Sequence, residues 1–231
     1  MKRVKTGIVN LDPLIQGGVK EKSINLVAGG AGSGKTIFAV QFLLEGLKEG
    51  ESCLYITFEE RKEKLYDDMS SSFGWNLQSY EEKNKFFYLE HSPEQVKSLI
   101  EEGGGTVDQI ISKHKIKRIV IDSITSFSLL YQDELTKKEA GLALFELINK
   151  WGCTALLTSQ AVSPRDGIHS AALEFEADSI ILLYHFKQDG KRQRALEILK
   201  MRGTDHTNAT MTLHISKEGL VVKPDQIVKT V

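Results

Sequence analysis

The sequence has little of what marks disulfide-rich, membrane-spanning or strongly charged proteins. It has two cysteines, Cys53 and Cys153, four prolines and a formal net charge of −1 over 231 residues. Both cysteines lie in apolar, strand-like runs, so we expect buried, reduced thiols. The near-neutral charge gives no global signal for nucleic acid or for a membrane surface. No apolar run approaches the roughly 18 residues of a membrane span, and polar sequence follows Met1-Lys2-Arg3, which favours a cytoplasmic protein.

The six histidines show no metal-ligand spacing, so we expect no structural metal. What remains is an ordinary globular composition, with 41% hydrophobic and 26% charged residues. The length suits one α/β domain with a full-sized core, and we expect residues 1–231 to form that single domain.

The most informative stretch is a glycine-rich run of eight residues: Gly29, Gly30, Ala31, Gly32, Ser33, Gly34, Lys35 and Thr36. It fits the phosphate-loop pattern Gly-x4-Gly-Lys-Ser/Thr, between an apolar strand at 24–28 and a helical pattern that begins at Ile37. Backbone N–H groups of such a loop and of the helix N-terminus can surround an anion. We expect Lys35 to reach the β- and γ-phosphates of a nucleoside triphosphate and Thr36 to coordinate Mg²⁺. A chance glycine-rich turn before a helix is the alternative.

Strand-like and helix-like segments alternate along the chain. The expected strands cover residues 24–28, 52–58, 86–89, 118–122, 153–158 and 180–184, and the expected helices 37–47, 61–72, 93–113 and 136–150. Three glycines at 103–105 should break the third helix. Residues 160–173 lack periodicity and should form a loop, and only strands and turns follow 184. This pattern predicts a three-layer α/β/α fold with a mostly parallel sheet and antiparallel strands at its C-terminal side.

Acidic residues end two of the expected strands. In open parallel sheets ligands bind beyond the carboxyl ends of the strands. Asp122 ends the strand 118–122 and should hold Mg²⁺, as a Walker B aspartate does. Glu59 and Glu60 follow the strand 52–58, where one of them could orient or deprotonate an attacking water. The alternatives are an Asp122 that caps a following helix and a solvated glutamate pair at a helix start.

Two further polar positions are candidates. Gln160 follows the strand 153–158, where it could sense the γ-phosphate or simply begin a loop. Lys200 and Arg202 would point the same way in a strand and would suit a polyanion, although a solvated strand face is the ordinary explanation.

Taken together, these residues resemble the KaiC-like group of RecA-superfamily ATPases. The resemblance covers almost the whole chain. It rests on Thr6-Gly7-Ile8, Leu11-Asp12, Gly17-Gly18, the phosphate loop, Thr57-Phe58-Glu59-Glu60, Ile121-Asp122-Ser123, Thr158-Ser159-Gln160 and the segment 200–206. It implies a RecA-like core in homo-oligomeric rings, usually hexamers, with ATP or ADP and Mg²⁺ between subunits. Lys200, Arg202 and His206 would then reach the nucleotide of the neighbouring subunit, so that hydrolysis depends on assembly.

The chain departs from the family pattern at three places. It has one such domain where the circadian clock member has two in tandem. The autophosphorylated Ser-Thr pair of that member falls on Glu174-Phe175 here, so we expect no autokinase activity. Gly30-Ala31 also differs from the commoner Pro-containing loop, without harm to phosphate binding.

The resemblance favours a slowly hydrolysing, ring-forming regulatory ATPase with an unknown protein partner. One alternative is a RecA/RadA-like recombination ATPase that depends on single-stranded DNA. Residues 161–172, which would carry the DNA contacts, offer only Arg165 and His169 as basic groups and no aromatic side chain for stacking. A second alternative is a nucleotide-gated binding module that barely turns over.

Overall fold

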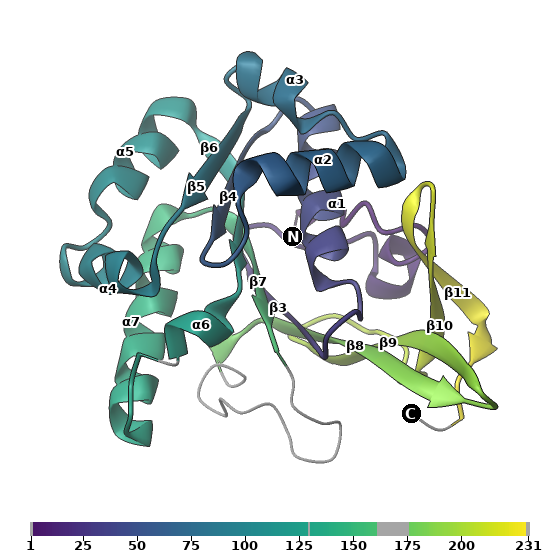
Figure 1. Ribbon diagram of the computed structural model, residues 1–231. Coiled ribbons are helices and arrows are strands. Elements are labelled where there is room, and N and C mark those ends of the chain that lie inside the picture. The colour runs from purple at the N-terminus through teal and green to yellow at the C-terminus, as the bar shows by residue number, and fades with distance from the viewer. Residues whose placement is uncertain (1, 129, 161–175, 230–231) are drawn as a thin grey trace.

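A nine-stranded sheet forms the centre of the computed structural model, which describes residues 2–128, 130–160 and 176–229 (Figure 1). The strand order is β11-β10-β9-β8-β3-β7-β6-β4-β5. Six neighbouring strands are parallel: β3 (Ile24–Gly29), β4 (Ser52–Thr57), β5 (Phe86–Glu90), β6 (Ile116–Asp122), β7 (Thr154–Ser159) and β8 (Ser179–Gln188). Antiparallel strands continue the sheet beyond β8: β9 (Lys191–Met201), β10 (Met211–Ser216) and β11 (Gly219–Ile227). The predicted mixed sheet is confirmed.

Helices cover both faces of this sheet (Figure 1). One face carries α1 (Lys35–Lys48), α2 (Lys62–Phe73) and α3 (Leu77–Glu82), and the other carries α4 (Pro93–Glu101), α5 (Gly105–His114), α6 (Ile124–Ser128) and α7 (Glu134–Trp151). Two separate clusters of buried side chains fill the space between the sheet and each helix layer. The alternation of strands and helices therefore produces the predicted α/β/α sandwich.

The long third helix is broken where its glycines predicted a break. Gly103, Gly104 and Gly105 all have positive φ angles, which glycine adopts without steric cost. Helix α4 therefore ends at Glu101 and α5 begins at Gly105. The short helices α3 and α6 were not predicted, and each is too short to show a helical period.

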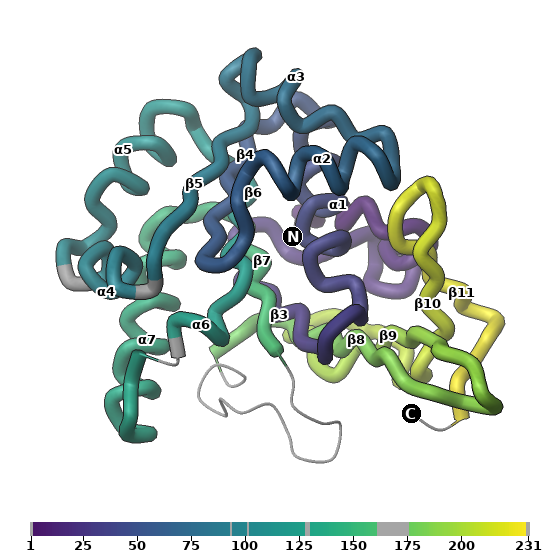
Figure 2. Tube along the Cα trace, in the orientation of Figure 1, coloured from purple at the N-terminus to yellow at the C-terminus, as the bar shows by residue number. Residues whose placement is uncertain are grey.

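The N-terminal segment packs beside the C-terminal hairpin, although the two are far apart in sequence (Figure 2). It forms the strand β1 (Arg3–Val4), the 3-10 turn η1 (Asp12–Ile15) and the strand β2 (Val19–Lys20). The Val9 amide donates to Leu220 O (3.2 Å) and the Val222 amide donates to Val9 O (3.0 Å). The N-terminal segment and β11 therefore lie side by side, and both pack against α1.

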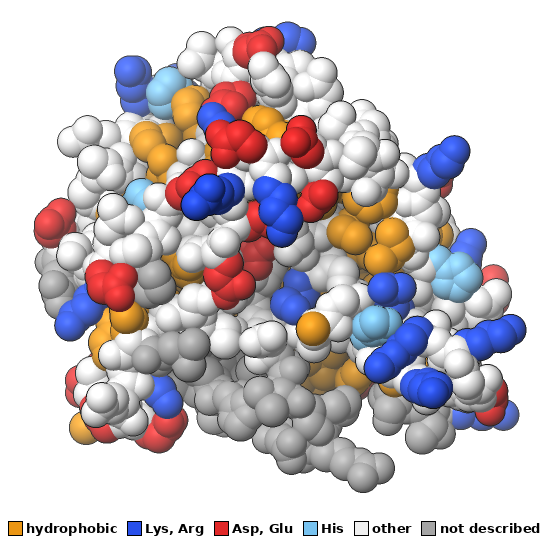
Figure 3. All heavy atoms as spheres, in the orientation of Figure 1, with side chains coloured by type: hydrophobic (Ala, Val, Ile, Leu, Met, Phe, Trp, Pro, Cys, Tyr) orange, Lys and Arg blue, Asp and Glu red, His pale blue; other side chains and the backbone are white. Residues whose placement is uncertain are grey.

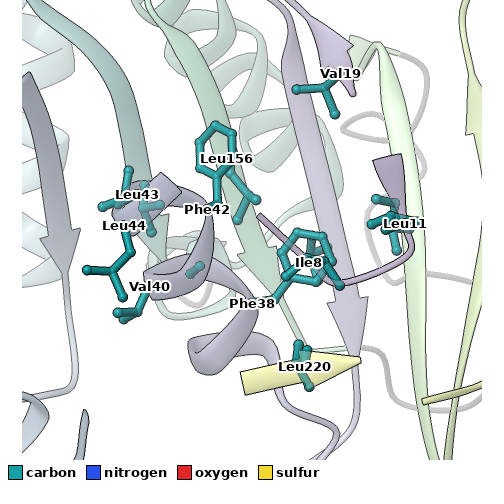
Figure 4. Close-up of a cluster of buried hydrophobic side chains, with 14 of the residues drawn as sticks. Ile8, Leu11, Val19, Phe38, Val40, Phe42, Leu43, Leu44, Leu156 and Leu220 are labelled. Carbon is teal, nitrogen blue, oxygen red and sulfur yellow. The ribbon is translucent and has the colours of Figure 1, made fainter. Parts of the chain in front are cut away.

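Figure 4 shows how the N-terminal segment and β11 pack against α1. Ile8, Phe38, Phe42, Leu156 and Leu220 are each at most 3% exposed and lie in one cluster. Burial of such a side chain contributes about 1.5–3 kcal/mol. Because Phe38 and Phe42 lie on α1, this packing fixes the helix that begins directly after the glycine loop.

A buried arginine provides a second anchor on the same face. The Arg118 side chain is 1% exposed and pairs with Glu51 (2.5 Å) and Glu49 (3.2 Å). It also donates to Phe42 O (2.9 Å) and Lys5 O (2.7 Å). Its charge is thus paired and its donors are used, as a buried cation requires. This contact joins the N-terminal segment, α1 and β6.

Both cysteines are buried free thiols, as predicted. Burial raises the pKa of the Cys53 thiol well above its usual range, and it raises the pKa of Cys153 to about 11. The predicted loop at 160–173 lies outside the described residues from position 161 onward. In the described part of the chain, no helix is long and apolar enough to cross a membrane.

Candidate functional site

The glycine loop turns sharply between the end of β3 at Gly29 and the start of α1 at Lys35. Gly32 has φ +72° and Gly34 has φ +106°, which are angles that favour glycine. A Cβ atom on Gly29 would collide with Leu183 O and with the Ser33 hydroxyl. These residues therefore let the backbone curl tightly, with the N-terminus of a 14-residue helix opening onto the loop.

Lys35 folds back over the loop that precedes it. Its ammonium donates to Gly29 O (2.8 Å) and Gly30 O (3.1 Å). Burial lowers the pKa of Lys35, and the carboxylates of Asp122 and Glu59 oppose that shift. A group whose charged form is disfavoured by burial gains from an added anion. The loop therefore holds a partly desolvated cation where a phosphate would neutralise it.

Three hydroxyl groups converge on the Asp122 carboxylate at the end of β6. Oδ2 accepts from Thr36 (3.0 Å) and from Tyr55 (2.6 Å), and Oδ1 accepts a short hydrogen bond from Thr158. Thr36 and Asp122, predicted as the two metal-binding residues, thus lie in direct contact. Burial raises the pKa of Tyr55 well above its usual range, so its hydroxyl keeps its proton and acts as a donor.

Tyr55 and Thr158 were not predicted as site residues. Each lies inside an apolar run, where tyrosine and threonine are ordinary strand residues. The neighbouring order of β4, β6 and β7 is what brings both side chains to Asp122. The position of Thr158, two residues before Gln160 at the carboxyl end of a strand, was the one usable signal.

The two glutamates lie in the connection between β4 and α2 and differ in their contacts. Glu59 Oε1 accepts from Ser123 (3.4 Å) and accepts a short hydrogen bond from Ser126. Glu60 Oε1 instead pairs with Lys64 at 3.3 Å. Glu59 is thus bonded to the segment that follows Asp122, whereas Glu60 is bonded to Lys64 on the following helix, α2.

A pocket of about 350 Å³ opens between these groups, lined by Thr36, Thr57, Glu59, Glu60, Arg61, Lys64 and Asp122. In Figure 3 acidic side chains lie together with Lys and Arg side chains over the β4–α2 connection, and Lys and Arg side chains gather over the β8–β9 hairpin. The pocket therefore joins the helix that follows the glycine loop to the carboxylates predicted from the sequence.

Gln160 follows β7 and is exposed. Its backbone N–H donates to Thr125 Oγ1 (2.7 Å), which ties the end of β7 to α6. The β7 strand lies between β3 and β6, so Gln160 is placed between the glycine loop and the end of the Asp122 strand.

Lys200 and Arg202 lie at the opposite end of the sheet, and His206 follows them in the connection between β9 and β10. Met201 pairs with Ser179, which pairs with Asn25 at the start of β3, whereas Leu196 pairs with Leu183 and Gly29 at its end. Asn25 and Gly29 are four residues apart along β3, so the two ends of the strand are separated by roughly 13 Å. The residues therefore do not lie beside the glycine loop of their own chain.

One detail of this segment differs from the prediction. Strand β9 ends at Met201, so Arg202 lies in a turn and does not share a strand face with Lys200. Its amide donates to Asp178 O (2.8 Å), and its guanidinium lies 4.0 Å from the Asp178 carboxylate. Gly203, with φ +58°, turns the chain away from the sheet. His206 Nδ1 lies 3.0 Å from Thr207 O.

The residues at the carboxyl end of β3 fit a triphosphate with Mg²⁺. The Ser33 hydroxyl in the loop is buried and has no hydrogen-bond partner, so a phosphate oxygen would satisfy it. Hydroxyl and carboxylate oxygens, as on Thr36 and Asp122, are the ligands that Mg²⁺ prefers. The chemistry of the donors therefore agrees with the glycine loop.

Comparisons with known proteins point to one family. A family model described as the KaiC ATPase matches residues 4–227. A UPF0273 protein of Pyrococcus horikoshii is 33% identical over 99% of this chain and 96% of its own length. The circadian clock protein KaiC3 of Synechocystis is also 33% identical, over 97% of this chain and 46% of its own length.

The fold agrees as well. The crystal structure of a KaiC-like protein from Pyrococcus horikoshii matches this chain with a TM-score of 0.85 and 33% identity, covering 96% of this chain and 99% of that one. With a RecA-like sheet, a phosphate loop and a family match over almost its entire length, the chain belongs to the KaiC ATPase family.

Proposed function

We propose that this protein binds ATP with Mg²⁺ and hydrolyses it slowly at the interface between copies of itself in a ring, most simply a hexamer. The observation that carries the proposal is the separation of the two halves of the site. The glycine loop, Asp122 and the glutamates lie at the carboxyl end of β3, and the segment 200–206 lies at the other end. A ring of copies would bring these two ends together.

Within one subunit, the roles follow from the contacts. The loop amides and Lys35 would bind the phosphates, and Ile37, in the first turn of α1, would support them. Thr36 and Asp122 would hold Mg²⁺, which neutralises charge on the β- and γ-phosphates when bound. Glu59 would accept a proton from the attacking water, because its bonds to Ser123 and Ser126 fix it beside the Asp122 segment. Gln160 would sense the γ-phosphate.

The neighbouring subunit would complete the site. Lys200, Arg202 and His206 of that neighbour would contact the triphosphate bound at the glycine loop of the first subunit. A cation supplied in this way stabilises charge in the transition state. Hydrolysis would then report assembly, which suits a regulatory ATPase. The regulated partner is a protein still to be identified.

Mass in solution, with and without ATP and Mg²⁺, tests the ring. We expect a mass several times that of one chain with nucleotide present. A monomer under every condition would overturn the intersubunit site. Phosphate release at each condition, compared with the Lys35→Ala variant, tests hydrolysis. Turnover no faster than that of the variant would favour a nucleotide-gated binding module.

The family match favours this proposal over a recombination ATPase that depends on single-stranded DNA. The loop that would decide between them, including Arg165 and His169, lies outside the described residues. Titration with single-stranded DNA at increasing salt separates the two. Tight binding that weakens steeply with salt would favour the recombination ATPase.

Two further points belong to the same proposal. We expect no autokinase activity, because Glu174 and Phe175 stand where the clock protein has its Ser-Thr pair; both lie outside the described residues. We also place the protein in the cytoplasm, where the reduced state of its two buried thiols is the rule.

A further inference from the structure

Two stacked tyrosines lie behind the candidate site. Tyr55 on β4 and Tyr88 on β5 are paired in the parallel register, so their side chains share one face of the sheet. Their ring centroids are 5.2 Å apart and their planes differ by 7°. The two hydroxyls bind different parts of the site: Tyr55 donates to Asp122 Oδ2 (2.6 Å) and Tyr88 donates to Glu60 O (2.9 Å).

We propose that Tyr55 and Tyr88 are positioning residues, which hold the magnesium-binding carboxylate and the glutamate-bearing connection in one fixed arrangement. The inference rests on the proposed function, because it assigns these tyrosines to the same ATP site. Neither side chain lines the pocket between Thr36 and the glutamates; each would act through the group that it holds.

Tyr55 helps to fix the orientation of the Asp122 carboxylate. Thr36 can coordinate Mg²⁺ through an oxygen lone pair and still donate its proton to Asp122 Oδ2, where Tyr55 is a second donor, while Thr158 donates to Oδ1. Donors on both oxygens fix the rotation of the carboxylate. Tyr55 is fully buried, so water does not compete for its hydroxyl. Such outer-shell donors orient the groups that hold a metal.

Tyr88 sets the connection that carries the glutamates. Thr57 Oγ1 accepts from the amides of both Glu59 (3.3 Å) and Glu60 (3.2 Å). Tyr88 adds a donor to the carbonyl of Glu60, so the connection is held from both sides. Because its ring stacks on Tyr55, the position of the connection is tied to the position of the Asp122 carboxylate.

Substitution of each tyrosine by phenylalanine tests the proposal, because it removes one hydroxyl and keeps the aromatic ring. Tyr55→Phe should raise the Mg²⁺ concentration for half-maximal binding of a fluorescent ATP analogue about tenfold. Binding of the analogue without Mg²⁺ should stay as in the wild type. Tyr88→Phe should leave the Mg²⁺ requirement unchanged and lower kcat roughly fivefold to tenfold, as expected for one lost hydrogen bond. Amides 58–61 should also exchange hydrogen faster in its nucleotide-free form.

Tyr66→Phe is the matched control. Tyr66 also packs on Tyr88, at 6.0 Å between centroids, but its hydroxyl donates to Glu81 outside the site. Its removal should change neither the Mg²⁺ requirement nor kcat. Melting of each nucleotide-free variant reports folding; if Tyr55→Phe does not fold, Tyr88→Phe decides the proposal.

Unchanged Mg²⁺ dependence in a folded Tyr55→Phe variant would overturn the proposal, as would unchanged kcat and amide exchange in Tyr88→Phe. A wild-type protein without Mg²⁺-dependent nucleotide binding would instead overturn the proposed function itself. The two failures are therefore distinguishable.

Discussion

The two ends of the β3 strand are built in different ways. At its carboxyl end the polar groups are bound to one another, with Thr36, Tyr55 and Thr158 all donating to Asp122. At its amino end the Arg202 side chain is 51% exposed and lies 4.0 Å from Asp178. Arg3 holds the nearby Thr204 hydroxyl (2.8 Å) from a strand that is only two residues long. One end is organised within the subunit, and the other lies at its surface, where a neighbouring copy can reach it.

The largest expected effect comes from removing the Arg202 side chain at the amino end of β3. Arg202→Ala should lower kcat by about 10³-fold, the lower end of what a cation supplied from a neighbour provides. Nucleotide binding by a single subunit should persist, because the glycine loop is far from Arg202. Steady-state phosphate release and binding of a fluorescent ATP analogue measure the two effects.

Mixing variants shows whether Arg202 acts across subunits. Lys35→Ala and Arg202→Ala should each be inactive alone, and mixed rings should recover part of the activity, because some interfaces then combine an intact loop with an intact Arg202. Lys48→Ala, which removes an exposed cation at the far end of α1, is the control and should behave as the wild type. Confirmed mixed rings without recovery would place Arg202 outside the site.

The second prediction sharpens the description of the carboxyl end. Glu59→Gln should keep ATP binding and lower kcat by roughly 10²-fold, within the range for loss of a positioned base. Glu60→Gln should have a smaller effect, because the Glu60 carboxylate pairs with Lys64 on α2. Phosphate release under single-turnover conditions separates chemistry from product release. Normal turnover in both single variants and in the double variant would exclude a catalytic glutamate here.

The third prediction concerns the support of the segment 200–206. Besides Thr204, Arg3 donates to Gly18 O (3.1 Å) and Gln16 (3.1 Å). Arg3→Ala should lower kcat in the assembled protein about fivefold through loss of these hydrogen bonds. Lys2→Ala removes the neighbouring charge, whose exposed pair with Glu21 contributes little. Equal effects of the two variants would mean that Arg3 acts only through its charge.

The comparison of the two ends also explains how far sequence reasoning reached. The glycine loop and the strand-end Asp122 were predictable because local spacing fixes both the residue types and their place on β3 and β6. The succession of strands and helices along the chain followed from apolar periodicity. These features depend on residues that are neighbours in sequence.

Features that depend on strand order were missed. Tyr55 and Asp122 are 67 positions apart, and their contact exists only because β4 lies beside β6. Arg118 is the first residue of the predicted strand 118–122, but its burial and its ion pairs with Glu49 and Glu51 were not predicted. They follow from the packing of α1 against β6. The end of β9 at Met201 was not predicted, because the flanking cations Lys200 and Arg202 are equally compatible with one continuous strand. Tertiary neighbours, rather than local propensity, decide the contacts of Tyr55 and Arg118.

The smallest expected effect concerns the cation at the carboxyl end. Because burial lowers the pKa of Lys35, the nucleotide-free protein is destabilised while this lysine is charged, and the destabilisation disappears as pH rises through the lowered pKa toward the ordinary value of 10.5. As pH rises toward 10.5, the Tm of the wild type should therefore rise relative to that of Lys35→Met, by about 1–3 °C. Saturating ATP and Mg²⁺ should reverse the trend for the wild type, since a phosphate favours the charged lysine. A difference that falls with pH in the nucleotide-free pair would show that Asp122 and Glu59 outweigh burial at Lys35.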